Sequence, residues 1–173
     1  AFRLDPRGGR VSSFRLHPPG RRRFLYIGCT LPCKGPDILE AWAAKLKATE
    51  PHASFTHVGH GSIRGFDNLG YQDLSDAVIR AEILGSCDFL LCAGRNDANP
   101  TTVLEAMCWG LVPLATETCG WVAPDVRLIR GGASEGAEDL RWWLWRADEE
   151  LAELRRFLRR RVETEYTWAR FTA

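Results

Sequence analysis

The alternation of short apolar runs with helical patterns is the feature that most limits how this chain can fold. Phe24–Ile27, Ser54–Val58, Asp88–Cys92 and Leu111–Ala115 are short runs bounded by turn residues, as expected for β-strands. The last two are almost wholly apolar, which is typical of parallel strands buried on both faces. Because helical patterns separate these runs, the chain is predicted to be α/β, with a parallel sheet and helices on both faces.

Besides a helix after Asn99 that ends at Gly110, three stretches have helical spacing, and two weaker runs complete the expected sheet. Pro36–Lys47 and Ser75–Ile83 are predicted helices, and the chain from Glu138 to about Tyr166 is expected to be helical. Phe66–Gly70 and Val126–Ile129 are the weaker strands. The second helix is expected to turn one apolar set toward the core, namely Ala77, Val78, Ala81 and Leu84.

Length and charge exclude several classes of protein. The 173 residues suit one compact domain. Residues 1–22 are rich in Arg, Gly and Pro and are predicted to be a linker or tail, so the domain is expected to comprise residues 23–173. The net charge of +1 gives no general attraction to nucleic acid, and no nucleic-acid partner is expected. No apolar run is long enough to span a bilayer and no signal peptide is evident, so a cytoplasmic location is expected.

The six cysteines do not have the spacing of a zinc ribbon. Several lie within apolar runs, where cysteine commonly packs as a small hydrophobic residue, so reduced cysteines and no metal site are expected. His57 and His60 lack an evident third ligand and are interpreted as loop residues near a strand end.

The segment 94–120 combines a helix start with two acidic residues. Asn99 is a good N-cap, and Pro100 suits the first helical position. Asp97 and Glu105 lie eight positions apart across this junction. The N–H groups of a helix N-terminus bind phosphate, and a carboxylate accepts hydrogen bonds from hydroxyl groups. The pattern predicts a ligand with phosphate and sugar hydroxyls; an ordinary capped helix with Glu105 as a surface charge is the alternative.

This segment resembles the signature of the retaining GT-B glycosyltransferases of family 4, in which seven residues separate the two acids. Asp97 occupies the first acidic position, where Glu is usual, and Ala98 replaces a common Gly. The positions that agree are Pro100, Leu104, Glu105, Ala106, Met107, Gly110 and Pro113. The resemblance implies a Rossmann-like domain that forms the C-terminal half of a GT-B fold.

The run from Phe24 to Trp42 resembles the first strand, glycine loop and helix of the same family. Gly28 and the pair Lys34–Gly35 agree with the family pattern, whereas Cys29 occupies the position of its phosphate-binding Arg. A Lys on a Gly-rich loop approaches a diphosphate closely and neutralises its charge. Three consequences of Cys29 stay open: Lys34 with the helix N-terminus suffices, a nearby Arg substitutes, or donor turnover is impaired.

Two further segments extend the resemblance to about residues 23–170. Leu69–Gly70–Tyr71 and the following helix, with Cys87–Asp88 at its end, are similar to the family unit that borders the nucleotide base, so Gly70 and Tyr71 are candidate neighbours of the base. Glu165–Trp168 resembles the acidic and aromatic ending of many members.

The resemblance implies the donor-binding half of a hexosyltransferase-like enzyme that transfers a sugar from a nucleotide sugar with retention. No cofactor or metal is implied, and the chain is expected to be inactive without an N-terminal acceptor-binding domain. By the same resemblance, Glu105 binds the ribose and Asp97 binds the transferred sugar, so Asp97 and Lys34 are the catalytic candidates. Lys34 and the N–H groups of Thr101 and Thr102 bind the diphosphate, beside Ala98 and Asn99.

Two other functions and a membrane contact remain alternatives. The departures at Cys29 and Asp97 favour a non-catalytic GT-B-like module that acts through protein or surface contacts, and an epimerase-like enzyme would use the same scaffold. The cluster of Trp and Arg in 141–146, followed by an Arg-rich stretch, resembles an interfacial helix in composition. The apolar stripe through Leu151 and Leu158 makes ordinary packing the favoured interpretation, with peripheral membrane contact as the alternative.

Overall fold

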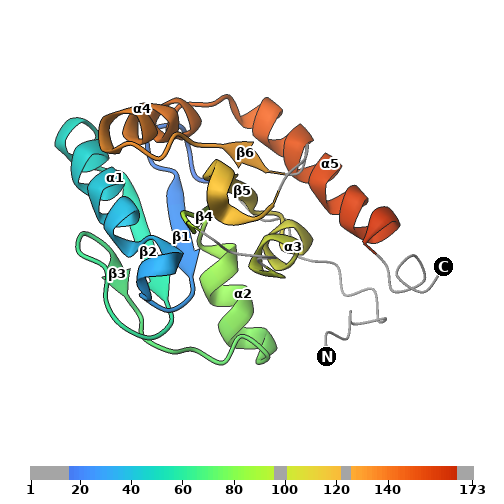
Figure 1. Ribbon diagram of the computed structural model, residues 1–173. Coiled ribbons are helices and arrows are strands. Elements are labelled where there is room, and N and C mark those ends of the chain that lie inside the picture. Colours follow the sequence, from blue (N-terminus) through green and yellow to red (C-terminus); the bar gives the residue numbers. More distant parts are fainter. Residues whose placement is uncertain (1–15, 96–100, 122–125, 167–173) are drawn as a thin grey trace.

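The computed structural model describes residues 16–95, 101–121 and 126–166. These residues form a six-stranded parallel sheet in the order β3-β2-β1-β4-β5-β6, with helices between the strands (Figure 1). The elements are β1 (Arg23–Ile27), η1 (Pro32–Lys34), α1 (Pro36–Thr49), β2 (Ser54–Val58), β3 (Asp67–Asn68), α2 (Ala77–Gly85), β4 (Phe89–Cys92), α3 (Thr101–Cys108), β5 (Val112–Ala115), η2 (Glu117–Cys119), β6 (Arg127–Leu128), α4 (Ala133–Leu144) and α5 (Asp148–Glu165).

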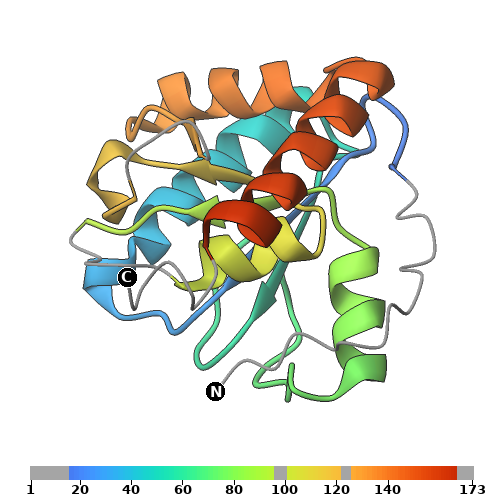
Figure 2. The same ribbon diagram turned by 90° about the vertical axis from the view of Figure 1, so that its right-hand side faces the viewer.

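Helices cover both faces of the sheet. On one face α1 packs along α4, and on the other α3 packs against α5, which also contacts β5 (Figures 1 and 2). This arrangement confirms the predicted α/β class with a Rossmann-like parallel sheet between two helical layers.

The core forms where β1, β4 and β5 lie next to one another. All residues of β4 and β5 are buried, which explains why these strands are apolar throughout. Phe24 on β1 is fully buried, and its ring stacks on Phe55 at 5.0 Å and on Phe89 at 5.2 Å between centroids. Each such buried side chain stabilises the fold by roughly 1.5–3 kcal/mol.

The second helix differs from the prediction in its start and in its inward face. α2 begins at Ala77, because the Asp76 carboxylate caps the helix by accepting hydrogen bonds from the N–H groups of Val78 and Ile79. Ala77, Val78 and Ala81 are exposed, so the prediction that they face the core is wrong. The helix buries only Ile83 and Leu84 at its C-terminal end, so its first turns project beyond the core.

The C-terminal region is two helices rather than one continuous stretch. α4 and α5 are separated by residues 145–147, and the two helices lie over different faces of the sheet. On α1, Leu39, Trp42 and Leu46 are buried against the core, whereas Ile38 is half-buried.

Residues 16–22, which the sequence predicts to be part of a linker or tail, pack against the domain. Arg22 is fully buried and donates hydrogen bonds to the carbonyls of His17 and Arg146 and to the Asp148 carboxylate. Residues 1–15 lie outside the described residues, so the division of the chain at residue 22 stays a prediction.

Asp88 is the acceptor that joins this N-terminal segment to the sheet. Its buried carboxylate accepts hydrogen bonds from the backbone N–H and the ring of His17 and from the N–H of Arg23. The guanidinium of Arg155, on α5, lies 3.4 Å from it. Burial lowers the pKa of Arg155 to about 10, which indicates how strongly the interior disfavours an unbalanced charge there.

We expect Asp88→Ala to destabilise the domain by about 3–5 kcal/mol, because it leaves the charge of Arg155 buried without its partner. Urea unfolding followed by circular dichroism measures the free energy of unfolding. The exposed Glu153→Ala on α5 is the matched control and should change it by less than about 0.5 kcal/mol. Equal stability of the two variants would contradict the role given to Asp88.

Candidate functional site

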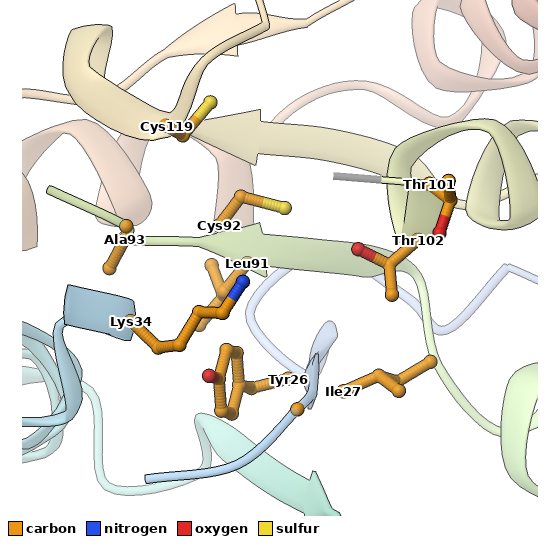
Figure 3. Close-up of a pocket in the computed structure, with 11 residues that line it drawn as sticks. Tyr26, Ile27, Lys34, Leu91, Cys92, Ala93, Thr101, Thr102 and Cys119 are labelled. Carbon is orange, nitrogen blue, oxygen red and sulfur yellow. The ribbon is translucent and has the colours of Figure 1, made fainter. Parts of the chain in front are cut away.

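A hollow of about 190 Å³ lies at the carboxyl ends of β1 and β4, beside the start of α3. In parallel sheets, ligands commonly bind at this edge, where neighbouring strands send their connections to opposite faces. Figure 3 shows Lys34 extending across the hollow toward Leu91, with Thr101 and Thr102 on the far side. The lining residues are Tyr26, Ile27, Gly28, Lys34, Leu91, Cys92, Ala93, Gly94, Thr101, Thr102 and Cys119.

A close backbone contact between Gly35 and Ala93 places Lys34 in this hollow. Gly35 has φ +70° and ends η1 while it begins α1. A Cβ atom at Gly35 would lie 2.0 Å from the carbonyl oxygen of Ala93, so only glycine permits this approach. The turn that carries Lys34 therefore rests directly on the carboxyl end of β4.

Arg95 holds the chain that follows β4 against the same turn. Its guanidinium donates to the Pro32 carbonyl at 2.8 Å and to the Asp37 carboxylate, and its N–H donates to the Cys33 carbonyl. The hydrogen bond from Arg95 holds the pKa of Asp37 below its usual value, although both side chains are exposed to solvent. Arg95 is thus a nearby Arg that could substitute for the phosphate-binding Arg missing at position 29, but its guanidinium is bound to Pro32 and Asp37.

The start of α3 supplies the second side of the hollow. Thr101 and Thr102 are the first two residues of this helix, and N–H groups in the first turn of a helix have no partner within the helix. Together with Lys34, they give the hollow donors and positive charge suited to an anion. Asp97, Ala98 and Asn99 lie outside the described residues, so their predicted roles stay predictions.

Glu105 lies one turn further along α3 and does not line the hollow. It is half-buried, and among the described residues its carboxylate has no hydrogen-bond or ion-pair partner. Burial raises its pKa above the ordinary 4.5. A carboxylate that is desolvated without compensation costs stability, which is typical of residues kept for binding rather than for folding.

Gly70 and Tyr71 do not line the hollow. The carbonyl of Gly70 accepts a hydrogen bond from Gly59, and the exposed ring of Tyr71 stacks on His60 at 5.4 Å. His60 in turn accepts a hydrogen bond from the N–H of Thr30, which follows the Gly28 turn. The structure therefore brings Gly28, Lys34, Thr101 and Thr102 together, with Gly70 and Tyr71 in an adjoining loop.

The neighbours of this site that were not predicted from sequence include His57, Cys92 and Cys119. His57 is not a loop residue, because it lies within β2 and is fully buried under the Gly28 turn. Cys92 and Cys119 line the hollow, and in sequence they differ in no visible way from the other cysteines. Cys92 is the last residue of β4 and Cys119 follows β5, and these positions at the carboxyl edge of the sheet, where ligands commonly bind, were the only available signal.

The described residues contain no group of three His, Cys, Asp or Glu side chains able to hold a metal ion. They also contain no disulfide, although all six cysteines are among them. No helix in the described ranges has both the length and the apolar character needed to cross a membrane.

The cluster of Trp and Arg in residues 141–146 is split between core and surface. Trp143 and Leu144 are buried, whereas Trp142 and Trp145 are about half exposed. Arg141 and Arg146 form ion pairs with Glu50 and Glu150. These contacts agree with packing as the main role of the cluster, and peripheral membrane contact stays an untested prediction.

By sequence, the chain matches no protein-family model and none of the curated proteins with which it was compared. By structure, it resembles the catalytic domain of cholesterol-α-glucosyltransferase from Helicobacter pylori, with a TM-score of 0.70 and 18% identity over 85% of this chain and 99% of that one. The C-terminal domain of a glycosyl transferase group 1 family protein (LpcC) from Francisella tularensis gives 0.67 and 18% over 87% and 89%.

A mutant of S. aureus TarM gives a TM-score of 0.72 and 16% identity over 91% of this chain, which spans only 35% of the TarM chain. The fold is therefore that of the C-terminal domain of GT-B glycosyltransferases, which confirms the predicted half of a GT-B fold.

We expect Glu105→Gln to raise the melting temperature at pH 7, because it removes a desolvated charge. Because the pKa of Glu105 is raised in the folded state, folding favours the protonated carboxyl group. The stability of the wild type therefore falls as the pH rises through the folded pKa and Glu105 becomes charged. The stabilisation should therefore disappear well below pH 4.5, where Glu105 is neutral in both states. Thermal unfolding across this pH range measures the effect. The exposed Glu153→Gln should give no such pH-dependent gain, and a destabilised Glu105→Gln at pH 7 would contradict the interpretation.

Proposed function

We propose that this chain is the donor-binding domain of a glycosyltransferase that transfers a sugar from a nucleotide sugar to an acceptor with retention of configuration. The observation that carries the proposal is the hollow between β1 and β4, where Lys34 faces the first turn of α3. The GT-B likeness supports it, and the TarM structure was solved in complex with UDP.

The donor's diphosphate is the ligand group that best fits the hollow. Lys34 would neutralise part of its charge, and the N–H groups at Thr101 and Thr102 would donate hydrogen bonds to its oxygens. During transfer, negative charge grows on the leaving diphosphate, and donors held in advance toward that charge lower the barrier. In this proposal, Lys34 acts on the leaving group.

The two carboxylates would bind the sugars on either side of the diphosphate. Glu105 would accept hydrogen bonds from the ribose hydroxyls, which would give its half-buried carboxylate the partners that it otherwise lacks. Asp97 would bind the hydroxyls of the transferred sugar, and Gly70 and Tyr71 would border the base. No metal ion or cofactor takes part in the proposed transfer.

The acceptor would bind to a second domain. GT-B enzymes close two Rossmann-like halves over a cleft, and this chain spans about a third of TarM. We therefore propose that transfer, with a hexosyltransferase-like specificity, requires an acceptor-binding domain in addition to these 173 residues. The chain by itself would bind the donor without turning it over.

Calorimetry with UDP tests the donor site directly. We expect weak binding to the wild type, a loss of about tenfold or more in Lys34→Met, and loss of most binding in Glu105→Ala, because each removes a charged partner of the ligand. Lys45→Met on α1 and Glu153→Ala on α5, both exposed, are the matched controls and should bind like the wild type. Equal binding of UDP by Glu105→Ala and the wild type would contradict the role of Glu105 in donor binding.

One observation favours the alternative of a non-catalytic module. Cys29 supplies no cation to the diphosphate, and the guanidinium of the neighbouring Arg95 is bound to Asp37 and the Pro32 carbonyl. A GT-B-like module that acts through protein or surface contacts would tolerate such a loss.

Restoring the family residues at positions 29 and 97 distinguishes a site that binds the donor in a modified way from one that has lost donor binding. If the site is adapted, Cys29→Arg combined with Asp97→Glu should bind UDP no more tightly than the wild type, because the existing donors already match the ligand. A gain of tenfold or more would favour the non-catalytic module. Isothermal titration of both proteins, with Cys33→Arg as the exposed control, makes the comparison.

A further inference from the structure

The peptide that joins Gly28 to Cys29 is held firmly from the side of β2. The carbonyl oxygen of Gly28 lies 2.9 Å from Nε2 of His57, which is fully buried. Gly59 lies against the same oxygen, since a Cβ atom there would approach it to 2.0 Å. The Gly28 carbonyl therefore points into the protein toward β2, and Nε2 must carry a proton because a carbonyl oxygen only accepts hydrogen bonds.

The other nitrogen of the same ring also faces an acceptor. Nδ1 of His57 lies 2.9 Å from Oδ1 of Asn68, on β3. The orientation of the Asn68 amide is set by the backbone: its NH₂ donates to the carbonyls of Ile63 and Phe66, and its Oδ1 accepts from the N–H of Ile63. Reversing the amide would place oxygen against two carbonyls. Nδ1 must therefore donate as well.

A histidine that donates through both nitrogens is an imidazolium. Burying a charge without an opposite charge is costly, but polar acceptors and an aromatic face offset part of the cost. His57 has two oxygen acceptors, and the ring of Tyr26 stacks on it at 5.5 Å between centroids. Among the described residues, no carboxylate forms an ion pair with it. A positive charge on this ring would therefore be left for an anion to balance.

The same contacts determine where the Cys29 N–H points. In a trans peptide the carbonyl and the following N–H point in opposite directions, and the described residues contain no cis peptide bond. Because the Gly28 carbonyl faces β2, the Cys29 N–H faces away from it, toward the β4 side where the hollow lies. The hydroxyl of Tyr26 donates to the Cys29 carbonyl at 2.8 Å and holds the next peptide in place.

We propose that His57 is a positively charged positioning residue that prepares the Gly28–Cys29 turn for a phosphate. It turns the Gly28 carbonyl away from the ligand, exposes the Cys29 N–H to it, and adds positive charge beneath the turn. In this way it replaces part of what the absent Arg at position 29 would supply. The inference rests on the proposed donor site and names a residue that touches no ligand itself.

The charge of His57 is measured without any ligand. A two-bond proton–nitrogen correlation spectrum of the wild type at pH 7 should show one histidine with both ring nitrogens protonated. That signal should persist in His17→Gln, His52→Gln and His60→Gln, which assigns it to His57 by elimination even if His57→Gln does not fold. A neutral ring with one protonated nitrogen would overturn the inference.

The effect on the phosphate is measured by titrating UDP and inorganic pyrophosphate into the wild type and His57→Gln. We expect both ligands to bind about tenfold more weakly to the variant, since one charge and one aligned N–H are lost. His52→Gln, in an exposed turn, is the control and should bind like the wild type. Tyr26→Phe keeps the ring over His57 but frees the Cys29 carbonyl, and should weaken binding by a smaller factor.

The outcomes separate this inference from the proposed function. If His57→Gln is folded and binds both ligands within twofold of the wild type, the positioning role is wrong while the donor site stands. If the wild type binds neither ligand, the proposed function fails and the role of His57 in phosphate binding falls with it, whereas the spectrum still decides its charge.

Discussion

The adjacency of β1 and β4 in the sheet is the constraint on which the rest of this structure depends. The helix that follows β1, α1, lies on one face of the sheet, and the helix that follows β4, α3, lies on the other. Where the helices after two neighbouring strands lie on opposite faces, a hollow opens at the carboxyl edge between those strands. Lys34, which lies between β1 and α1, and Thr101 and Thr102, which begin α3, line this hollow together although nearly seventy positions separate them in the sequence.

The two ends of the sheet have opposite electrostatic characters. At the amino end, Asp88 is surrounded by donors from His17, Arg23 and Arg155, and its carboxylate holds the N-terminal segment and α5 together. At the carboxyl end, the Glu105 carboxylate is desolvated and has no partner among the described residues. A balanced buried charge stabilises a fold, whereas unbalanced charges cost stability and persist where a ligand completes them.

Two residues near Cys29, which occupies the position of the family's phosphate-binding Arg, lie where they could take over part of its role. Arg95 lies close to the turn, but it is bound to Asp37 and so fixes the loop instead of facing the hollow. His57 occupies the layer below the turn, where its contacts orient the Gly28 peptide. For the proposed phosphate site, the backbone would supply aligned N–H groups and the buried ring of His57 would supply positive charge in place of the missing guanidinium.

The sequence by itself determined the order of elements, the parallel sheet and the helix that begins near Thr101, because these depend on local periodicity and on cap and turn residues. It also singled out Gly28, Lys34, Thr101 and Thr102 as site candidates, because glycine loops and helix starts have local signals, and the structure brings these four residues together around one hollow. The predictions that the first turns of α2 face the core and that His57 lies in a loop were wrong, because each depends on which residues lie across the sheet rather than along the chain. Only the tertiary structure decided that Asn68 and Gly28 would meet the two sides of one imidazole ring, since hydrogen bonds between neighbouring strands have no counterpart in the spacing of a single strand.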